Sequence, residues 1–209
     1  MSKHLDLEEQ EQLDELKAWW KAYGKLVSNA VLGLLVAYAA YQGWHYYQGK
    51  QAVEASAEYQ ALQVLDSKDV KAIQSKSAII MDKYSSTPYA GRAALLAAKA
   101  NYASSDAKSA KAQLEWAIKN AKETSISAIA SLELAVILSE EKDYQGALKL
   151  LEAKHDAGFD GLFSDLKGDV LVALGKKAEA KAAYEHALTK LDAQGKYHVL
   201  TQQKLEALG

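Results

Sequence analysis

The feature that most constrains this chain is a run of 22 residues, 26–47, which contains no Asp, Glu, Lys or Arg. As an α-helix the run would be about 33 Å long, close to the roughly 30 Å hydrocarbon core of a bilayer. A helix bonds its own backbone amides, so it can cross lipid where no water is present to bond them. Aromatic residues lie near the two ends of the run, as is usual at membrane interfaces. They are Trp19, Trp20 and Tyr23 on one side and Trp44, Tyr46 and Tyr47 on the other. The run therefore predicts a single transmembrane helix over residues 26–47.

Two other interpretations of this run fit the sequence less well. A buried core helix is usually shorter and carries a polar stripe, which the run lacks. Ala37-Tyr38-Ala39 resembles a signal-peptide cleavage site. However, the 25 residues before the run contain six acids, and the apolar run continues beyond Ala39. We therefore expect the span to be retained.

The lysines around the span predict its orientation. Lys17, Lys21 and Lys25 precede the span closely, whereas only Lys50 follows it closely. Because cytoplasmic segments carry the excess of Lys and Arg, we expect the N-terminus in the cytoplasm. Residues 1–25 then form a cytoplasmic segment, and about 160 residues lie on the other side of the membrane.

The cytoplasmic segment has an amphipathic pattern. Leu13, Leu16 and Trp20 recur at helical spacing between charged residues, which predicts a short amphipathic helix. Such a helix either lies on the membrane surface beside the span or docks a cytoplasmic partner. The sequence leaves both interpretations open.

Beyond residue 47 the chain is electrically balanced, with 21 basic and 21 acidic residues. This balance provides no basic face of the kind that binds nucleic acid. The chain has no cysteine, which excludes disulfides and thiolate metal sites. A single proline and abundant alanine favour an all-helical domain.

Residues 48–87 are expected to be linker helices that pack on the domain after them. Their apolar residues recur at near-helical spacing, so the transmembrane helix is expected to continue outward. These residues are Val53, Ala57, Leu62 and Leu65. Asp69 is suited to cap a second helix over 70–84. Thr87 then lies at a cap position before Pro88, whose missing N–H costs nothing at the first helical position.

From Pro88 onward the sequence repeats, and its last copy follows the 34-residue tetratricopeptide pattern. The matching residues are Gly168, Leu171, Gly175, Ala180, Tyr184 and Ala187. Gly168 and Ala180 are expected to let two antiparallel helices approach closely, with Tyr184 between them and Gly175 in the turn. A copy 33 residues earlier contains Leu134, Ala135, Leu138, Tyr144, Ala147 and Leu151, and a looser one contains Ala97, Ala98, Ala110, Leu114 and Ala117. The expected fold is therefore all-α: an N-terminal transmembrane helix, then a TPR-like α-solenoid over 88–209 that ends in a capping helix over 195–208.

No constellation of residues predicts an enzyme. The five histidines form no HExxH pair and no close ligand cluster, and no nucleotide-binding or hydrolase loop is present. We therefore expect no catalytic residue, no cofactor and no metal.

What remains is a binding surface on the concave side of the helical pairs, which is lined by the first helix of each pair. The apolar residues expected there are Leu95, Tyr102, Ile129, Leu132, Val136, Leu162 and Val172, and the charged ones include Arg92, Lys99, Asp165 and Asp169. The first six are the predicted partner-binding residues. A groove with so many apolar positions predicts an apolar segment of a partner protein as its ligand. The alternative is that residues 48–84 fold back and fill the groove.

Several short segments along the whole chain resemble one bacterial family. They are Lys17-Ala18-Trp19-Trp20-Lys21-Ala22-Tyr23-Gly24-Lys25, Gly43-Trp44-His45-Tyr46-Tyr47, Ser56-Ala57-Glu58-Tyr59-Gln60, Tyr89-Ala90-Gly91, Ser131-Leu132-Glu133-Leu134-Ala135, Gly158-Phe159 and Asp165-Leu166-Lys167-Gly168. Together they resemble the ancillary SecYEG translocon subunit family over nearly the full length of the chain.

The resemblance implies a single-pass protein of the bacterial inner membrane with a periplasmic TPR-like domain. Its implied partners are the SecYEG translocon and a membrane-anchored periplasmic chaperone, which the protein would link as a non-enzymatic adaptor. Two other functions remain open. One is a TPR-type membrane import receptor with a cytosolic domain, which the lysines before the span oppose. The other is a soluble secreted helical binding protein after signal cleavage.

Overall fold

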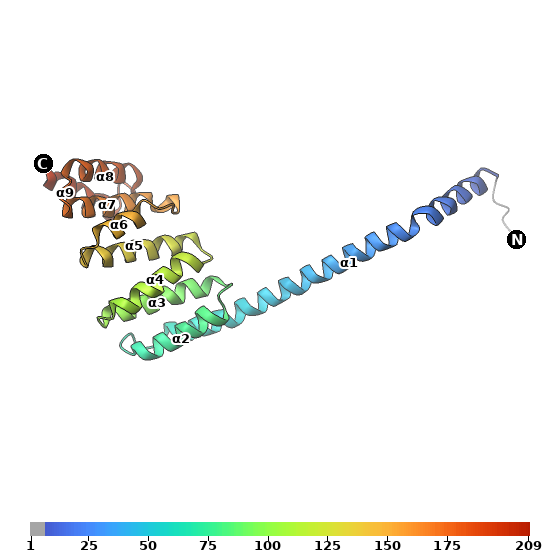
Figure 1. Cartoon of the computed structure of the whole chain (residues 1–209), viewed down its shortest axis with the longest axis horizontal. Helices are drawn as coiled ribbons and strands as arrows, with labels where there is room; N and C mark the ends of the chain where they lie inside the picture. The colour runs from blue at the N-terminus through green and yellow to red at the C-terminus, as the bar shows by residue number, and fades with distance from the viewer. Residues whose placement is uncertain (1–6) are drawn as a thin grey trace. The chain divides into compact units, whose positions relative to one another are not determined.

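The structure is a computed structural model that describes residues 7–209, so the first six residues of the expected cytoplasmic segment lie outside the described residues. Every regular element in the described part is a helix, as predicted. The helices are α1 (Leu7–Gln63), α2 (Val70–Lys83), α3 (Pro88–Ala103), α4 (Ala107–Asn120), α5 (Thr124–Glu140), α6 (Tyr144–Leu151), the 3₁₀ helix η1 (Ala157–Phe159), α7 (Asp160–Ala173), α8 (Lys177–Lys190) and α9 (Lys196–Leu208) (Figure 1). The chain divides into two compact units, Met1–Lys50 and Gln51–Gly209, and α1 contributes residues to both.

The first unit consists of a single element in its described part, the N-terminal portion of α1. Helix α1 is long and apolar enough to cross a membrane, and the protein does not bury its apolar stretch. It runs without a break through residues 25 and 47, where we expected segment boundaries. The amphipathic segment is therefore not a separate short helix. No proline interrupts the chain at that point, so helical hydrogen bonding continues into the apolar run.

The second unit begins with the last turns of α1, which pack together with α2 and α3. Leu62, Ile73 and Ile80 are buried there against a row of alanines on α3. The predicted cap is present, because Asp69 Oδ1 accepts a 3.0 Å hydrogen bond from the Ala72 N–H. Thr87 occupies the predicted cap position of α3, but its hydroxyl donates to the Tyr84 carbonyl at 2.8 Å. The start of α3 therefore depends on Pro88 at its first position and not on a side-chain cap.

Three antiparallel helical pairs follow, α3–α4, α5–α6 and α7–α8, and the first helices of successive pairs contact one another. Each pair has the same turn, in which one residue has a left-handed backbone: Ser105 (φ 66°), Lys142 (φ 67°) and Gly175 (φ 75°). The next residue donates its N–H to a carbonyl five residues back in all three turns, which is the hydrogen bond of a Schellman motif. The predicted repeat is thus present in the backbone, with glycine at only one of the three left-handed positions.

The last pair shows how the small residues of the repeat are used. A Cβ on Gly168 would overlap the ring of Tyr184, so Gly168 makes room for that ring. Ala180 is fully buried in the same cluster, together with Leu171 and Tyr184. Tyr184 thus lies against Gly168, between the two helices, as predicted, and Ala180 is buried beside it.

Candidate interaction surface

An open hollow of about 390 Å³ lies between the first helices of the first two pairs. Its walls are formed by Ala98, Lys99, Tyr102 and Ala103 of α3, Leu114 of α4, and Glu133, Val136 and Ile137 of α5. Ala98, Leu114 and Ile137 also belong to a buried apolar cluster, so the floor of the hollow is continuous with the core. The residues from 48 to 84 do not line it. They stack on α3 as a further layer, and do not fill this part of the groove.

The structure brings two of the six predicted partner-binding residues together in this hollow. Tyr102 and Val136 line it, and their side chains are 39% and 40% exposed. The other four residues, Leu95, Ile129, Leu132 and Leu162, are half-buried. Leu95 and Leu132 pack against two different core clusters. Leu95 and Leu132 therefore contribute to packing in the free protein, and Tyr102 and Val136 are the most exposed of the six residues.

Charged groups form the rim of the hollow. Lys99 was among the predicted groove residues, whereas Glu133 was not. Burial raises the pKa of Glu133 above its ordinary value, and the charge of Lys99 opposes this rise. The hydroxyl of Tyr102 donates to the carboxylate of Glu140, which links the ends of α3 and α5. The hollow thus combines an apolar floor with a cation, two carboxylates and a phenol at its edge.

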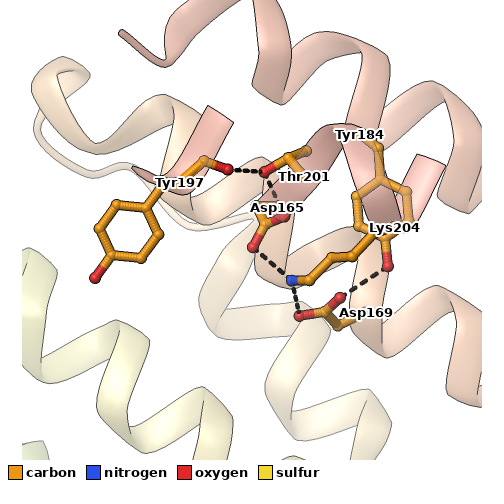
Figure 2. A network of polar contacts seen from close by, with 6 residues as sticks. All are labelled: Asp165, Asp169, Tyr184, Tyr197, Thr201 and Lys204. Carbon is orange, nitrogen blue, oxygen red and sulfur yellow. Dashed lines mark hydrogen bonds and ion pairs between the residues drawn. The ribbon is translucent and has the colours of Figure 1, made fainter. Parts of the chain in front are cut away.

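In the last pair, helix α9 covers the predicted groove positions on the first helix, α7. Asp165 accepts hydrogen bonds from the Thr201 hydroxyl and from Lys204 Nζ, both at 2.8 Å. Asp169 accepts from Lys204 Nζ at 2.7 Å and from the Tyr184 hydroxyl at 2.8 Å. Figure 2 shows that these side chains converge from α7, α8 and α9, while the ring of Tyr197 points away from them. Two predicted groove positions, Asp165 and Asp169, are therefore occupied by the protein itself.

This network changes the pKa values of two of its members. Burial and the hydrogen bond to Asp169 both raise the pKa of the Tyr184 hydroxyl. Burial opposes the charged form of Lys204, but its bonds to Asp165 and Asp169 prevail and raise the pKa of its ammonium group. Both groups therefore keep their protons at neutral pH, as the drawn hydrogen bonds require.

In the first pair, too, a predicted groove residue is bonded to another residue of the protein itself. Arg92 makes two 2.7 Å hydrogen bonds to the carboxylate of Glu123. This bidentate pair joins the second turn of α3 to the segment that precedes α5, and Arg92 is not free to bind a ligand. The open part of the concave surface thus lies between Arg92 and the region covered by α9, at the hollow lined by Tyr102 and Val136.

Comparison with known proteins places the chain in a family. A family model described as a tetratricopeptide repeat-like domain matches residues 17–209. An ancillary SecYEG translocon subunit of Neisseria gonorrhoeae is 32% identical, over 97% of this chain and 98% of that protein. This chain belongs to the ancillary SecYEG translocon subunit family. A member from Haemophilus influenzae is 29% identical over 87% of this chain and 89% of its own length. One from Escherichia coli is 25% identical over 96% of both chains. No solved structure matches.

The name of this family describes an accessory subunit, in agreement with the expectation that the chain is not an enzyme.

A second hollow, of about 560 Å³, is lined by residues of α6, α7 and α8 and contains a serine–histidine pair that could suggest catalysis. Ser164 Oγ lies 2.9 Å from His186 Nδ1, and both residues are accessible. Among the described residues no carboxylate is bonded to His186, and no group of acids and histidines is arranged to hold a metal. A serine–histidine pair without a third orienting group lacks an element that activated nucleophiles usually have.

Proposed function

We propose that this chain is a non-enzymatic adaptor at the Sec translocon of the bacterial inner membrane. Residues 26–47 of α1 would form its single span, with the N-terminus in the cytoplasm and the repeat domain in the periplasm. The proposal is supported by the apolar, unburied stretch of α1, the lysines before it and the names of the relatives.

The observation that carries the binding part of the proposal is the hollow lined by Tyr102 and Val136. It is open, has an apolar floor and is not occupied by another segment of the unit to which it belongs. Exposed apolar surface above a well-packed core is typical of protein-binding sites. We propose that an apolar segment of a partner inserts here and also contacts the half-buried Leu95, Ile129, Leu132 and Leu162 along the first helices of the pairs.

The proposed partners are SecYEG and a membrane-anchored periplasmic chaperone that receives the translocated chain. Proteins confined to one bilayer meet at high effective concentration, so weak contacts can hold them together. Because the floor of the hollow is apolar and the outer part of the chain is charge-balanced, binding should be driven mainly by burial of apolar surface. It should therefore respond only mildly to salt.

The experiment that tests this proposal compares two valine substitutions in the full-length chain. Val136 lies in the hollow. Val172 of α7, which the repeat pattern also assigned to the groove, is equally exposed, at 41%, but lies outside the hollow. Val136→Asp should reduce co-purification of SecYEG from solubilised membranes, because a carboxylate would have to be buried under the partner. Val172→Asp is the matched control and should co-purify normally. If Val136→Asp folds and retains its partners, the binding surface lies elsewhere.

A further inference from the structure

Lysines outnumber the nearby acids at the N-terminal end of the apolar stretch of α1. Lys17 pairs with Asp14 at 2.9 Å. Lys21 has other lysines, Lys17 and Lys25, four residues away on both sides, and like charges at this spacing repel one another on a helix. The sequence has no acid between Glu15 and Glu54. An anion supplied from outside the chain would therefore be attracted to this face.

Trp20 is held close to the helix at the same level. Within residues 9–50, whose side-chain exposure is described, only Gly24 is buried. A Cβ on Gly24 would lie 3.0–3.1 Å from three atoms of the Trp20 indole, so the indole lies against the glycine backbone. The indole thus lies along the helix towards the apolar run, and it remains 55% exposed.

Trp20 borders two neighbouring hollows on the surface of α1, and both are lined mainly by apolar surface. One is lined by Leu16, Lys17, Trp19, Trp20 and Lys21. The other, of about 360 Å³, is lined by Trp20, Val27, Ser28, Val31, Leu32 and Leu35. Two lysines therefore border the first hollow, whereas no charged residue borders the second, which runs towards the middle of the membrane stretch. This is the order of charged and apolar parts in a phospholipid.

We propose that this part of α1 binds one anionic phospholipid, with its phosphate at Lys21 and an acyl chain along Val27–Leu35. Trp20 lies where the two parts of the lipid meet, and Gly24 allows the indole to lie flat enough to leave room for the chain. The proposal rests on the placement of residues 26–47 in a bilayer, which is part of the proposed function. Free phosphate shares the charge of the headgroup, but it would not use the apolar hollow.

The other end of the span provides an internal comparison. Trp44 and Tyr47 contact each other there, with ring centroids 6.5 Å apart. No side chain lies within 4 Å of where a Cβ would be on Gly43 or Gly49. Trp44 is therefore an indole at the expected membrane interface, as Trp20 is. It differs in that its ring does not rest on a glycine and that only one lysine, Lys50, is nearby.

The experiment uses the full chain in phosphatidylcholine vesicles that contain a minor fraction of brominated lipid, which quenches tryptophan on contact. One protein keeps only Trp20, with Trp19, Trp44 and Trp116 replaced by Phe. The matched protein keeps only Trp44. Brominated phosphatidylglycerol should quench Trp20 more than brominated phosphatidylcholine does, with an enrichment of about fivefold for one lysine at an anionic surface. Trp44 should show no such preference.

Three variants and the addition of inorganic phosphate complete the test. Lys21→Gln and Gly24→Leu should each abolish the preference at Trp20, whereas Lys50→Gln at the other end should leave it unchanged. Excess inorganic phosphate should not displace the lipid. Equal quenching of Trp20 by both lipids, in protein that floats with the vesicles, would overturn the lipid site and leave the span intact. Loss of the preference on adding phosphate would show a site for the free anion instead. Protein that does not float with the vesicles would contradict the span, and the lipid site with it.

Discussion

At the scale of residues, the turn inside each helical pair is the most regular feature of the repeat domain. Its left-handed position is taken by Ser105, Lys142 and Gly175 in turn. A residue with a Cβ costs roughly 1–2 kcal/mol in this conformation, and glycine does not pay that cost. The sequence pattern identified Gly175 as a turn residue, but it could not identify Ser105 or Lys142. Their conformation is imposed by the packing of the helices on either side and not by their own preferences.

The first prediction follows from this difference. Lys142→Gly should stabilise the domain by up to about 1 kcal/mol, since relief of backbone strain exceeds the extra flexibility of glycine in the unfolded chain. Gly175→Ala is the matched change in the opposite direction and should destabilise by about 1 kcal/mol. Urea unfolding of fragment 51–209, which contains all four apolar clusters, measures both effects. Two changes of the same sign would contradict this account of the turn.

The candidate site shows a similar limit of the sequence. Lys99 and Val136 occupy equivalent places of two repeats, and the structure brings them to one hollow, as periodicity predicts. Glu133 was not predicted to line the hollow. The 34-residue pattern indicates the helix face on which a residue lies, but it does not indicate which residues of the neighbouring helix lie close to it. The hydrogen bond between Tyr102 and Glu140 joins residues that are 38 apart, and no local pattern identifies such a pair.

At the scale of elements, α9 is the helix whose role was least visible in the sequence. A capping helix was predicted over 195–208, and the structure has it at Lys196–Leu208. Leu205 and Leu208 of α9 pack against the last apolar cluster. The hydrogen bonds of α9 to α7 come from Thr201 and from Lys204, which reaches two carboxylates on successive turns. Neither hydrophobic periodicity nor the repeat pattern specifies these hydrogen-bond partners, because the paired groups are hydrophilic.

The second prediction concerns the pH dependence of this attachment. Tyr184 and Lys204 both have a pKa that is raised in the folded protein. The folded state therefore holds its protons more tightly, and the stability that this provides is present below the unfolded pKa values, near 10. It is lost as the pH rises above them. The urea midpoint of fragment 51–209 should fall above about pH 10, and it should fall less steeply in the double variant Tyr184→Phe/Lys204→Met. Equal slopes for the two proteins would show that the network does not couple stability to pH.

At the scale of the whole molecule, the chain joins an apolar helix to a repeat domain with an open hollow. The sequence specified the helical class, a helix apolar enough to cross a membrane and the three helical pairs, because each depends on periodicity, composition or turn residues. It did not specify the continuity of α1 through residue 25. The amphipathic pattern of residues 13–20 was strong enough to suggest a separate helix, but the chain contains no residue there that ends one.

The third prediction concerns topology, which distinguishes the adaptor from an import receptor with a cytosolic domain. The chain has no cysteine, so a single one introduced at Lys154 or at Glu11 can be labelled without background. A membrane-impermeant maleimide should label the Lys154→Cys protein in cells with a permeabilised outer membrane. It should label the Glu11→Cys protein only after lysis. The reverse pattern would place the repeat domain in the cytosol, and a shortened mature chain would indicate cleavage of the span.

The central claim is that partners dock at the hollow between α3 and α5. It is tested most directly by placing a photoreactive phenylalanine at Tyr102 in the full-length protein and irradiating intact membranes. The same residue at Val172, which is also exposed but lies outside the hollow, is the control. The account predicts adducts with a translocon subunit or a membrane-anchored chaperone from position 102 and few or none from position 172. Adducts of equal yield from both positions, or adducts from position 172 alone, would contradict it.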